Sequence, residues 1–239
     1  MLRAPALLVL TALASVACGS PRDASPMPEP PSLDLSKIGP YREVVTDTVV
    51  PATTVIPLEG QAGTAPPGSI LRVTPLDSIG PAIVVSIRDD GGFDEITIPG
   101  VSGNELRFQV VEGTARSAPQ DAFYLQPPGG TYYLTPSLRY DCLTLAPGFE
   151  VTFASMGVAT LTLTNGCSSA VTVANPVSRT GAPGSRTSTP LPLTIAAGES
   201  ARLTLEFQGS AFGGAEDTLF FDVTLDNRAI RYPITLFAP

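Results

Sequence analysis

The chain contains no histidine and no tryptophan, and Lys37 is its only lysine. Without histidine, no Ser-His or Cys-His nucleophile pair can form, and zinc loses its commonest ligand. A single lysine also disfavours a Ser-Lys dyad. A pair of carboxylates could still act as acid and base, as in glycosidases. Nothing in the sequence selects such a pair from the 22 acidic residues, so we expect no catalytic site, no metal and no cofactor.

Basic clusters are absent too. The formal net charge is −8, and a surface of that sign is a poor match for nucleic acid. No segment keeps an apolar character over the roughly 20 residues needed to cross a bilayer. The longest apolar run, from Ala4 to Ala14, follows Arg3 and precedes small residues. This layout predicts a signal peptide over residues 1–17 and an exported mature chain.

Cysteine is rare, with three residues, and the first of them follows this signal. The stretch Ser15-Val16-Ala17-Cys18 resembles the lipobox of bacterial lipoproteins, with Ser15 where that family usually has leucine. The resemblance implies that Cys18 is acylated and anchors the chain to the membrane. The following Gly19 and Ser20 lack the aspartate that retains such proteins in the inner membrane, which implies the outer membrane. The alternative is ordinary cleavage after Ala17, since this is also a small-x-small site.

Residues 18–42 are rich in proline and serine and show no apolar periodicity. Such a segment cannot bury enough surface to offset the entropy of ordering it. We therefore predict a disordered tether between the anchor and the folded part of the chain.

The whole chain has 22 glycine and 25 proline residues, a composition typical of short strands joined by turns. Residues 43–119 contain several segments in which apolar residues recur at every second position. In one of them, Leu106, Phe108 and Val110 alternate with Arg107 and Gln109, so the latter two are expected to face solvent. The pattern predicts an all-β chain whose first domain, 43–119, is a β-sandwich.

The turn Asp89-Asp90-Gly91-Gly92 between two such segments predicts a tight hairpin. Together with Gly60, Ala62, Pro67, Gly68, Ser69, Val73 and Phe93, this region resembles the Ig-like modules related to carboxypeptidase regulatory domains. Some relatives bind calcium at acidic turns. The acids here, Asp89, Asp90, Asp94 and Glu95, lack the spacing of a calcium loop, so turn chemistry is the favoured interpretation.

Residues 120–139 contain a Pro-Pro-Gly-Gly break and are predicted to be an interdomain linker. They also carry the densest group of aromatic side chains in the chain, Phe123, Tyr124, Tyr132 and Tyr133. These side chains either form a ligand-stacking patch or pack at the domain junction, and we favour packing.

Residues 140–239 alternate more clearly, and they predict a second sandwich with a hairpin about Asp226-Asn227. Pro233 cannot donate a ladder hydrogen bond, so its strand is expected at an edge or with a bulge. The segments Thr164–Cys167 and Pro192–Phe207 resemble the abnormal-spindle/hydin type of Ig-like domain, related to major sperm protein. That family's roles are scaffolding and protein binding.

The two remaining cysteines, Cys142 and Cys167, lie at the start of one predicted strand and the end of the next. If these strands pair antiparallel, the sulfurs can meet, and export permits a disulfide. The alternative is two separate buried thiols.

The function expected from these features is that of a non-enzymatic, membrane-anchored lipoprotein that binds a protein or another envelope component, or serves a structural role. Two alternatives stay open. A carbohydrate-binding module would have to stack sugars on tyrosine because tryptophan is absent, and a carboxylate-based hydrolase would need two acids about 5–9 Å apart in a cleft.

Overall fold

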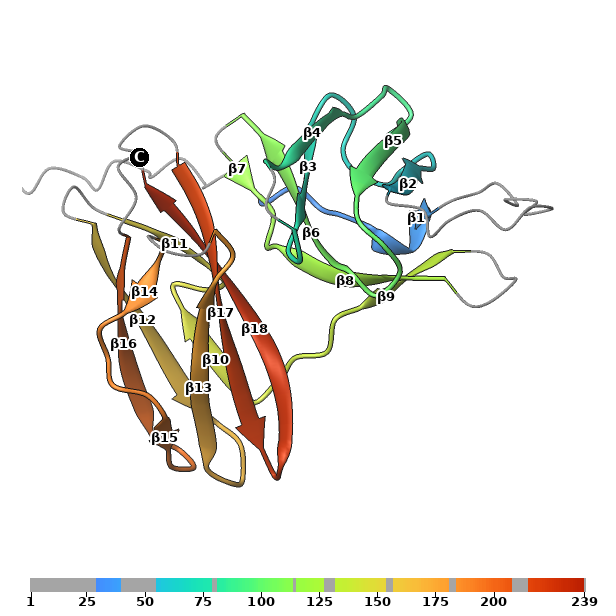
Figure 1. The fold of residues 1–239 in the computed structure, drawn as a ribbon. Helices are drawn as coiled ribbons and strands as arrows, with labels where there is room; N and C mark the ends of the chain where they lie inside the picture. The colour runs from blue at the N-terminus through green and yellow to red at the C-terminus, as the bar shows by residue number, and fades with distance from the viewer. Residues whose placement is uncertain are drawn as a thin grey trace, which may run out of the picture.

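The computed structural model describes residues 29–39, 55–78, 81–113, 115–126, 132–153, 157–180, 184–207 and 215–238. These residues form β-strands in four sheets and one 3-10 turn, η1 (Leu35–Lys37), with no α-helix among them. The predicted all-β fold is confirmed. The strands make two modules, each with its own apolar core (Figure 1). We call residues 31–136 the first module and residues 140–238 the second module.

The first module has a three-stranded and a six-stranded sheet. The three-stranded sheet has the order β1-β2-β5, and the six-stranded sheet has the order β4-β3-β6-β8-β9 with β7 beside β6. The strands are β1 (Ile38–Gly39), β2 (Val55–Gly60), β3 (Ile70–Pro75), β4 (Ile83–Ser86), β5 (Phe93–Pro99), β6 (Glu105–Glu112), β7 (Ala115–Arg116), β8 (Gln120–Leu125) and β9 (Tyr133–Pro136).

Alternating apolar residues of the two sheets meet between them. Ile56, Leu58 and Ile98 come from the smaller sheet, and Leu71 and Phe108 come from the larger one. All five side chains are fully buried. Period-two alternation places these side chains on one face of each strand, so the sheets close on a common core.

The first module begins earlier than the sequence predicts. Ile38, within the predicted tether 18–42, is buried in the core, and β1 pairs antiparallel with β2. Leu33 and Leu35 pack on the same core, and the backbone N–H of Asp34 donates to the carbonyl oxygen of Thr64. These three apolar side chains supply buried surface that holds this part of the segment on the first module. Residues 18–28 and 40–42 lie outside the described part.

The predicted linker over 120–139 is also mostly sheet. β8 pairs antiparallel with β6, and β9 pairs antiparallel with β8. Ala122 and Tyr124 alternate into the core of the first module, which a linker would leave exposed. The Pro-Pro-Gly-Gly break, 127–130, lies outside the described residues. The connection between the modules is therefore short, from Ser137 to about Arg139.

The turn at Asp89–Gly92 does not make the predicted hairpin. Its carbonyl and N–H groups do close a tight turn, with Arg88 N–H donating to Gly92 O and Gly91 at φ +81°. However, β4 pairs with β3, whereas β5 pairs with β2 in the other sheet. The turn therefore carries the chain across the sandwich, and the register that decides this belongs to strands distant in sequence.

The second module has a four-stranded sheet, β10-β12-β16-β14, and a five-stranded sheet, β11-β18-β17-β13-β15. The strands are β10 (Leu143–Ala146), β11 (Glu150–Thr152), β12 (Val158–Asn165), β13 (Val171–Ser178), β14 (Arg186–Thr187), β15 (Leu193–Ile195), β16 (Ser200–Glu206), β17 (Ala215–Leu225) and β18 (Arg228–Ala238).

The longest pair, β17 and β18, is the hairpin predicted about Asp226-Asn227. Both turn residues have positive φ, 49° and 65°, as a two-residue turn of this kind requires. Pro233 lies opposite Phe220 of β17, and β11 pairs with β18 only from Thr235 onward. At Pro233 the strand therefore has a neighbour on one side only, which confirms the edge alternative locally.

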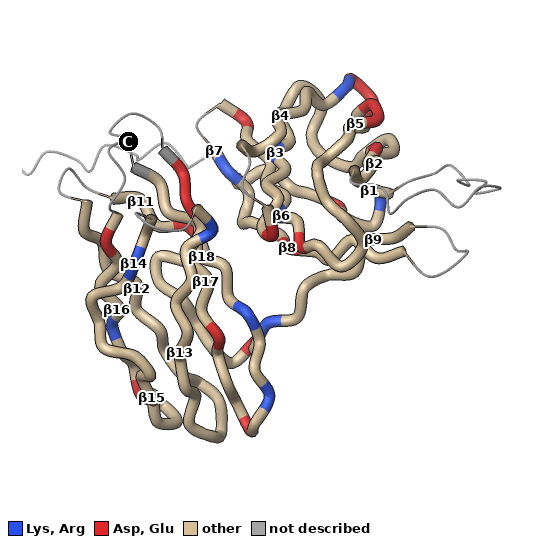
Figure 2. Tube along the Cα trace, viewed as in Figure 1, with Lys and Arg blue, Asp and Glu red and all other residues tan. Residues whose placement is uncertain are grey.

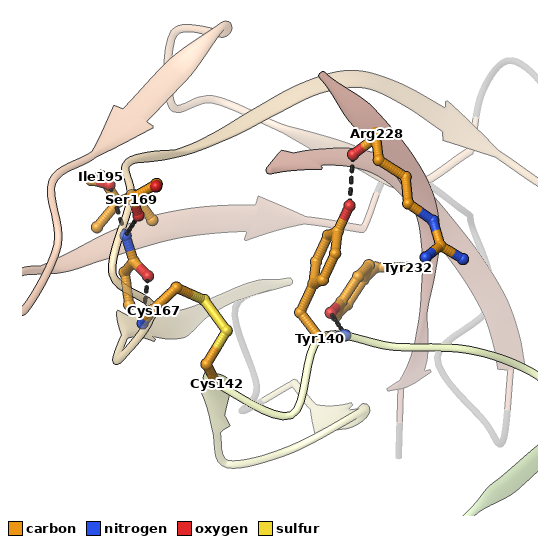
Figure 3. The surroundings of a disulfide bond; sticks show 8 residues. Tyr140, Cys142, Cys167, Ser169, Ile195, Arg228 and Tyr232 are labelled. Carbon is orange, nitrogen blue, oxygen red and sulfur yellow. Dashed lines mark hydrogen bonds between the residues drawn. A yellow bond between two sulfur atoms is a disulfide. The ribbon is translucent and has the colours of Figure 1, made fainter. Parts of the chain in front are cut away.

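Cys142 and Cys167 form a disulfide, with a Cα–Cα distance of 4.9 Å (Figure 3). The antiparallel strand pairing on which the predicted disulfide depends is confirmed, because β10 pairs antiparallel with β12 and Leu143 lies opposite Asn165. The buried Asn165 amide donates to the carbonyl oxygens of Ser169 and Ile195 and accepts from the Cys167 N–H. This clamp fixes the turn that presents Cys167 to Cys142.

Within the described residues there is no helix long and apolar enough to span a bilayer. Residues 1–28, with the predicted signal peptide and Cys18, lie outside that part of the chain.

Candidate functional site at the module junction

Strand β6 is buried on both faces. Arg107 and Gln109, expected in solvent, are only 3% and 2% exposed. The sequence pattern identified the inner face correctly, but the outer face is covered by the second module. We call this contact, made by β3, β6 and β8 of the first module with β11, β17 and β18 of the second, the module junction. Charged positions of both signs gather there (Figure 2).

Arg107 is the centre of the module junction. Its Nε and Nη2 donate to the two carboxylate oxygens of Asp121, at 2.7 and 2.8 Å. Nη2 also donates to Pro233 O at 2.8 Å, and Nη1 donates to Phe149 O and to the hydroxyl of Thr235. Each of the five guanidinium N–H groups therefore has an acceptor, which is the condition for burying an arginine without a large penalty.

The contact with Pro233 explains how the open edge of β18 is covered. In a strand, the carbonyl oxygen and the N–H of one residue point to the same side. At Pro233 this side faces away from β17. No strand lies beside it there, and proline has no N–H to donate. The guanidinium of Arg107 takes the place of the missing strand, so the first module completes the sheet edge of the second.

Glu105, with no exposed surface, is the second centre. Its carboxylate oxygens accept from Arg139 and, at 2.8 Å, from Arg231. Arg231 also donates to Asp77 at 2.7 Å, and Arg139 donates to Asp121 at 3.1 Å. Arg139 thereby joins the two centres into one network of alternating charges.

Contacts at the rim extend this network. Arg72 of β3 forms an ion pair with Glu216 of β17, and the Gln109 amide donates to the Glu150 carboxylate at 2.7 Å. Arg179 of the second module donates to Pro75 O at 3.0 Å. The two modules are thus connected through side chains from several strands of each, in addition to the short connection of the chain.

The environment of Glu105 keeps its carboxyl ionised. Burial by itself raises the pKa of this group, but the guanidinium groups of Arg139 and Arg231 outweigh burial and hold the pKa below its usual value. A lowered pKa in the folded state means that stability is present above the unfolded pKa, about 4.3, and is lost as the pH falls through the folded value.

We therefore expect Glu105→Gln to be less stable than the parent at neutral pH but to lose less stability on acidification. Urea unfolding between about pH 7 and pH 3 tests this, because the slope with pH counts the protons taken up on unfolding. Glu95→Gln, on the exposed face of β5, is the matched control and should follow the parent curve. Equal acid slopes for Glu105→Gln and the parent would contradict the role given to Glu105.

A cavity of about 520 Å³ opens beside the module junction. Its walls come from the N-terminal segment Leu33–Ser36, from Pro119–Asp121 at the start of β8, from the end of β9 and the connection after it, and from Phe149 of the second module. We call it the junction pocket. Asp121 and Arg139 belong both to its wall and to the ion-pair network, and the second module contributes Phe149 to the wall.

The aromatic residues of 120–139 do not form a common surface. Tyr124 and Tyr132 are buried and stack with ring centroids 4.8 Å apart, while Phe123 is half-buried and Tyr133 is 47% exposed. The favoured interpretation, packing, holds for Tyr124 and Tyr132, but these side chains pack in the core of the first module and not at the domain junction. The alternative, a ligand-stacking patch of the four side chains, is not formed, because Tyr133 is the only exposed one among them.

The acidic turn is an arginine-linked cluster. Asp90 and Asp94 both accept from Arg88, at 3.2 and 2.7 Å, and Asp90 accepts from the Gly92 N–H. Hydrogen bonds from Gly92 and Arg88 lower the pKa of Asp90 despite the opposing effect of burial. Across the described residues no group of three or more candidate metal ligands occurs. Asp89 and Glu95 are exposed.

The sequence did not reveal the residues of the module junction. Glu105, Arg107, Asp121 and Arg231 alternate with apolar residues, as solvated charges on a sheet do. Their burial depends on the docking of a second module, which no local pattern encodes.

Comparison with known proteins identifies no family for this chain. No protein family matches it, and no curated protein matches it. Among solved structures, it is similar to the VesB protease of Vibrio cholerae, at 13% identity and a TM-score of 0.33. The match covers 81% of this chain and 64% of that one, so the chain spans less than two thirds of that protein.

Proposed function

We propose that this chain is a bacterial surface lipoprotein, anchored in the outer membrane through acylated Cys18, whose two Ig-like modules have a non-catalytic binding or structural role. The observation that carries the proposal is the buried ion-pair network of the module junction. We infer that this network holds the modules as one rigid unit, as a spacer or a presenting scaffold needs. A protein or another envelope component is the proposed partner, and nucleic acid is not, given the net charge of −8.

The two family resemblances are part of this proposal, and contacts within each motif support them. The missing side chain of Gly60 leaves room for the Phe93 ring, which would lie 2.2 Å from a Cβ at that position. Gly60 and Phe93 are both residues of the carboxypeptidase-regulatory-like motif. In the abnormal-spindle-like motif, Asn165 clamps the turn and Gly166 donates to Cys142 O at 2.8 Å.

The hydrogen bonds and ion pairs of the buried carboxylates support a non-catalytic role. Among the described residues the buried carboxylates are Glu105 and Asp217. Asp217 accepts hydrogen bonds from Ser178, Ser185 and Thr218, and these lower its pKa although burial raises it. A glycosidase needs one acid with a raised pKa. Glu105 and Asp121 both contact Nη2 of Arg139, but each of these carboxylates is ion-paired with arginine.

The anchoring is supported by the lipobox-like sequence and by the disulfide, which is typical of exported proteins. The first described buried residue of the N-terminal segment is Pro31. The chain between Cys18 and Pro31 can span at most about 45 Å. The proposed anchor therefore holds the first module within that distance of the membrane surface.

Cys18→Ser is expected to release the protein from the membrane fraction into the soluble fraction of the cell envelope, because the acylated sulfur is lost. Cell fractionation followed by immunoblotting measures this. Ser20→Ala, two residues away, is the matched control and should stay with the membranes. A Cys18→Ser protein that remains membrane-bound, or a mature N-terminus without lipid in mass spectrometry, would refute the anchor.

A further inference from the structure

The junction pocket has the size and position of a ligand site. Its volume of about 520 Å³ lies within the range of small-molecule pockets, about 300–1,000 Å³, and such pockets occur preferentially where domains meet. Both modules and the N-terminal segment contribute walls. The ion pairs of Asp121 hold one wall in place, so the pocket is preformed.

The charges around the pocket indicate a neutral ligand. Asp121 is paired with Arg107 and Arg139, and Arg139 is paired in turn with Glu105. In the N-terminal segment of the wall, Asp34 accepts from Ser36 and lies 3.8 Å from Lys37. Each charged wall group therefore already has a counter-charge. An ionic ligand would have to compete with these pairs, whereas a neutral ligand can use the remaining acceptor positions of the carboxylates.

The walls combine polar and apolar groups. Carboxylates, the Gln120 amide and the Ser36 hydroxyl line the pocket beside Leu33, Pro119 and Pro136. Asp34 Oδ2 and Asp121 Oδ1 each keep an acceptor position, since the protein's own hydrogen bonds fill the other oxygen of each carboxylate, and such positions suit hydroxyl groups of a ligand. Apolar wall residues suit the C–H face of a sugar ring. We propose that the junction pocket binds a short neutral glycan.

An extended peptide fits this pocket less well. Peptides that add to a sheet edge need unpaired backbone groups. Here the wall backbone is already used, since Asp34 N–H donates to Thr64 O, Ser36 N–H to the Asp34 carboxylate and Ser137 N–H to Asp121 O. Among the wall side chains, the Gln120 amide already donates to Leu33 O and the Ser36 hydroxyl to Asp34, so side-chain acceptor atoms remain for recognition.

This inference deepens the proposed binding role and places the ligand next to the proposed membrane tether, because Leu33–Ser36 is one wall. Its test is independent of the anchor. Isothermal titration calorimetry is performed on the full-length protein in a detergent without a sugar headgroup. The probes are four neutral tetrasaccharides: chitotetraose, cellotetraose, maltotetraose and mannotetraose. At least one is expected to bind with a Kd of about 1 mM or tighter.

Ser36→Trp fills the pocket from an exposed position and is expected to weaken that binding at least about tenfold. Ser32→Trp is the matched control, since it makes the same change on the same segment, at an exposed residue outside the pocket wall. It should bind within about twofold of the parent. Thermal unfolding should show that both variants are folded.

Three results would overturn the glycan proposal. The first is that none of the four probes binds. The second is that Ser36→Trp binds as the parent does, or that Tyr133→Ala, at an exposed residue outside the pocket wall, abolishes binding instead. The third is that a proline-rich peptide occupies the pocket while the sugars do not. None of these outcomes bears on membrane anchoring, which Cys18→Ser tests separately.

Discussion

Replacing Arg107 with methionine is expected to lower the free energy of unfolding by about 3–5 kcal/mol. The methionine keeps much of the side-chain volume but removes every donor. Asp121 then loses its bidentate partner in a site that is almost closed to water, and Pro233 O loses its donor on the open edge of β18. Asp121 keeps only its contact with Arg139 at 3.1 Å, so a poorly compensated buried charge is the dominant cost. Urea unfolding followed by fluorescence and circular dichroism measures the change.

Arg88→Met is the matched control for this experiment. Arg88 also contacts two carboxylates, those of Asp90 and Asp94, but its side chain is 44% exposed. Solvent screens such pairs, so the loss should be much smaller than in Arg107→Met. Small-angle scattering should show a broader distribution of distances in Arg107→Met, because the modules lose their main connection, and no change in Arg88→Met. Equal losses in the two variants would contradict the central position of Arg107.

Removing the disulfide by the double substitution Cys142→Ala and Cys167→Ala is expected to cost about 3.5 kcal/mol in the second module. The bond closes a loop with a sequence separation of 25, and its loss restores entropy to the unfolded chain. Leu143 and Asn165 still pair in the variant, so the fold should be retained at low denaturant. The midpoint of urea unfolding reports the loss.

The parent protein under reducing conditions is the control for the double variant. Both lack the same cross-link, so their unfolding curves should coincide, while the oxidised parent unfolds at higher urea. A double variant as stable as the oxidised parent would show that the bridge does not contribute to the stability of the native state. A variant that unfolds without denaturant would show that it is required for folding.

These two experiments address different levels of the structure. The disulfide acts within one module, between strands that are close in sequence. Arg107 acts between modules and joins residues more than 100 positions apart, such as Arg107 and Pro233. Glu105 and Arg231 do the same at the second centre. Changes at these positions test whether the proposed rigid unit exists, which the stability of a single module does not.

The alternation of apolar residues predicted the strands of both cores correctly, because the side-chain period of a strand is a local property. The hairpin about Asp226-Asn227 was predictable for the same reason, since the two residues tolerate positive φ. The disulfide followed from the positions of Cys142 and Cys167 at facing strand ends. Each of these features depends on residues that are near in sequence.

Predictions failed where pairing joined distant segments. The turn at Asp89–Gly92 has the local chemistry of a hairpin, but β5 pairs with β2 because its apolar face completes the other sheet. Residues 120–139 contain a break typical of a linker, yet Tyr124 and Ala122 are core residues of the first module. The predicted tether ends at Ile38 because its side chain enters that core.

The amino-acid sequence by itself determined the all-β class, the inner face of most strands and the disulfide, since periodicity, turn chemistry and cysteine position are encoded within short segments. Only the tertiary structure decided that Glu105 and Arg107 are buried, and that a pocket forms beside Asp121. An arginine on a solvated sheet face and an arginine in a module junction have the same sequence pattern. The difference arises from which surface docks against it, and that depends on the shape and charge of the whole second module.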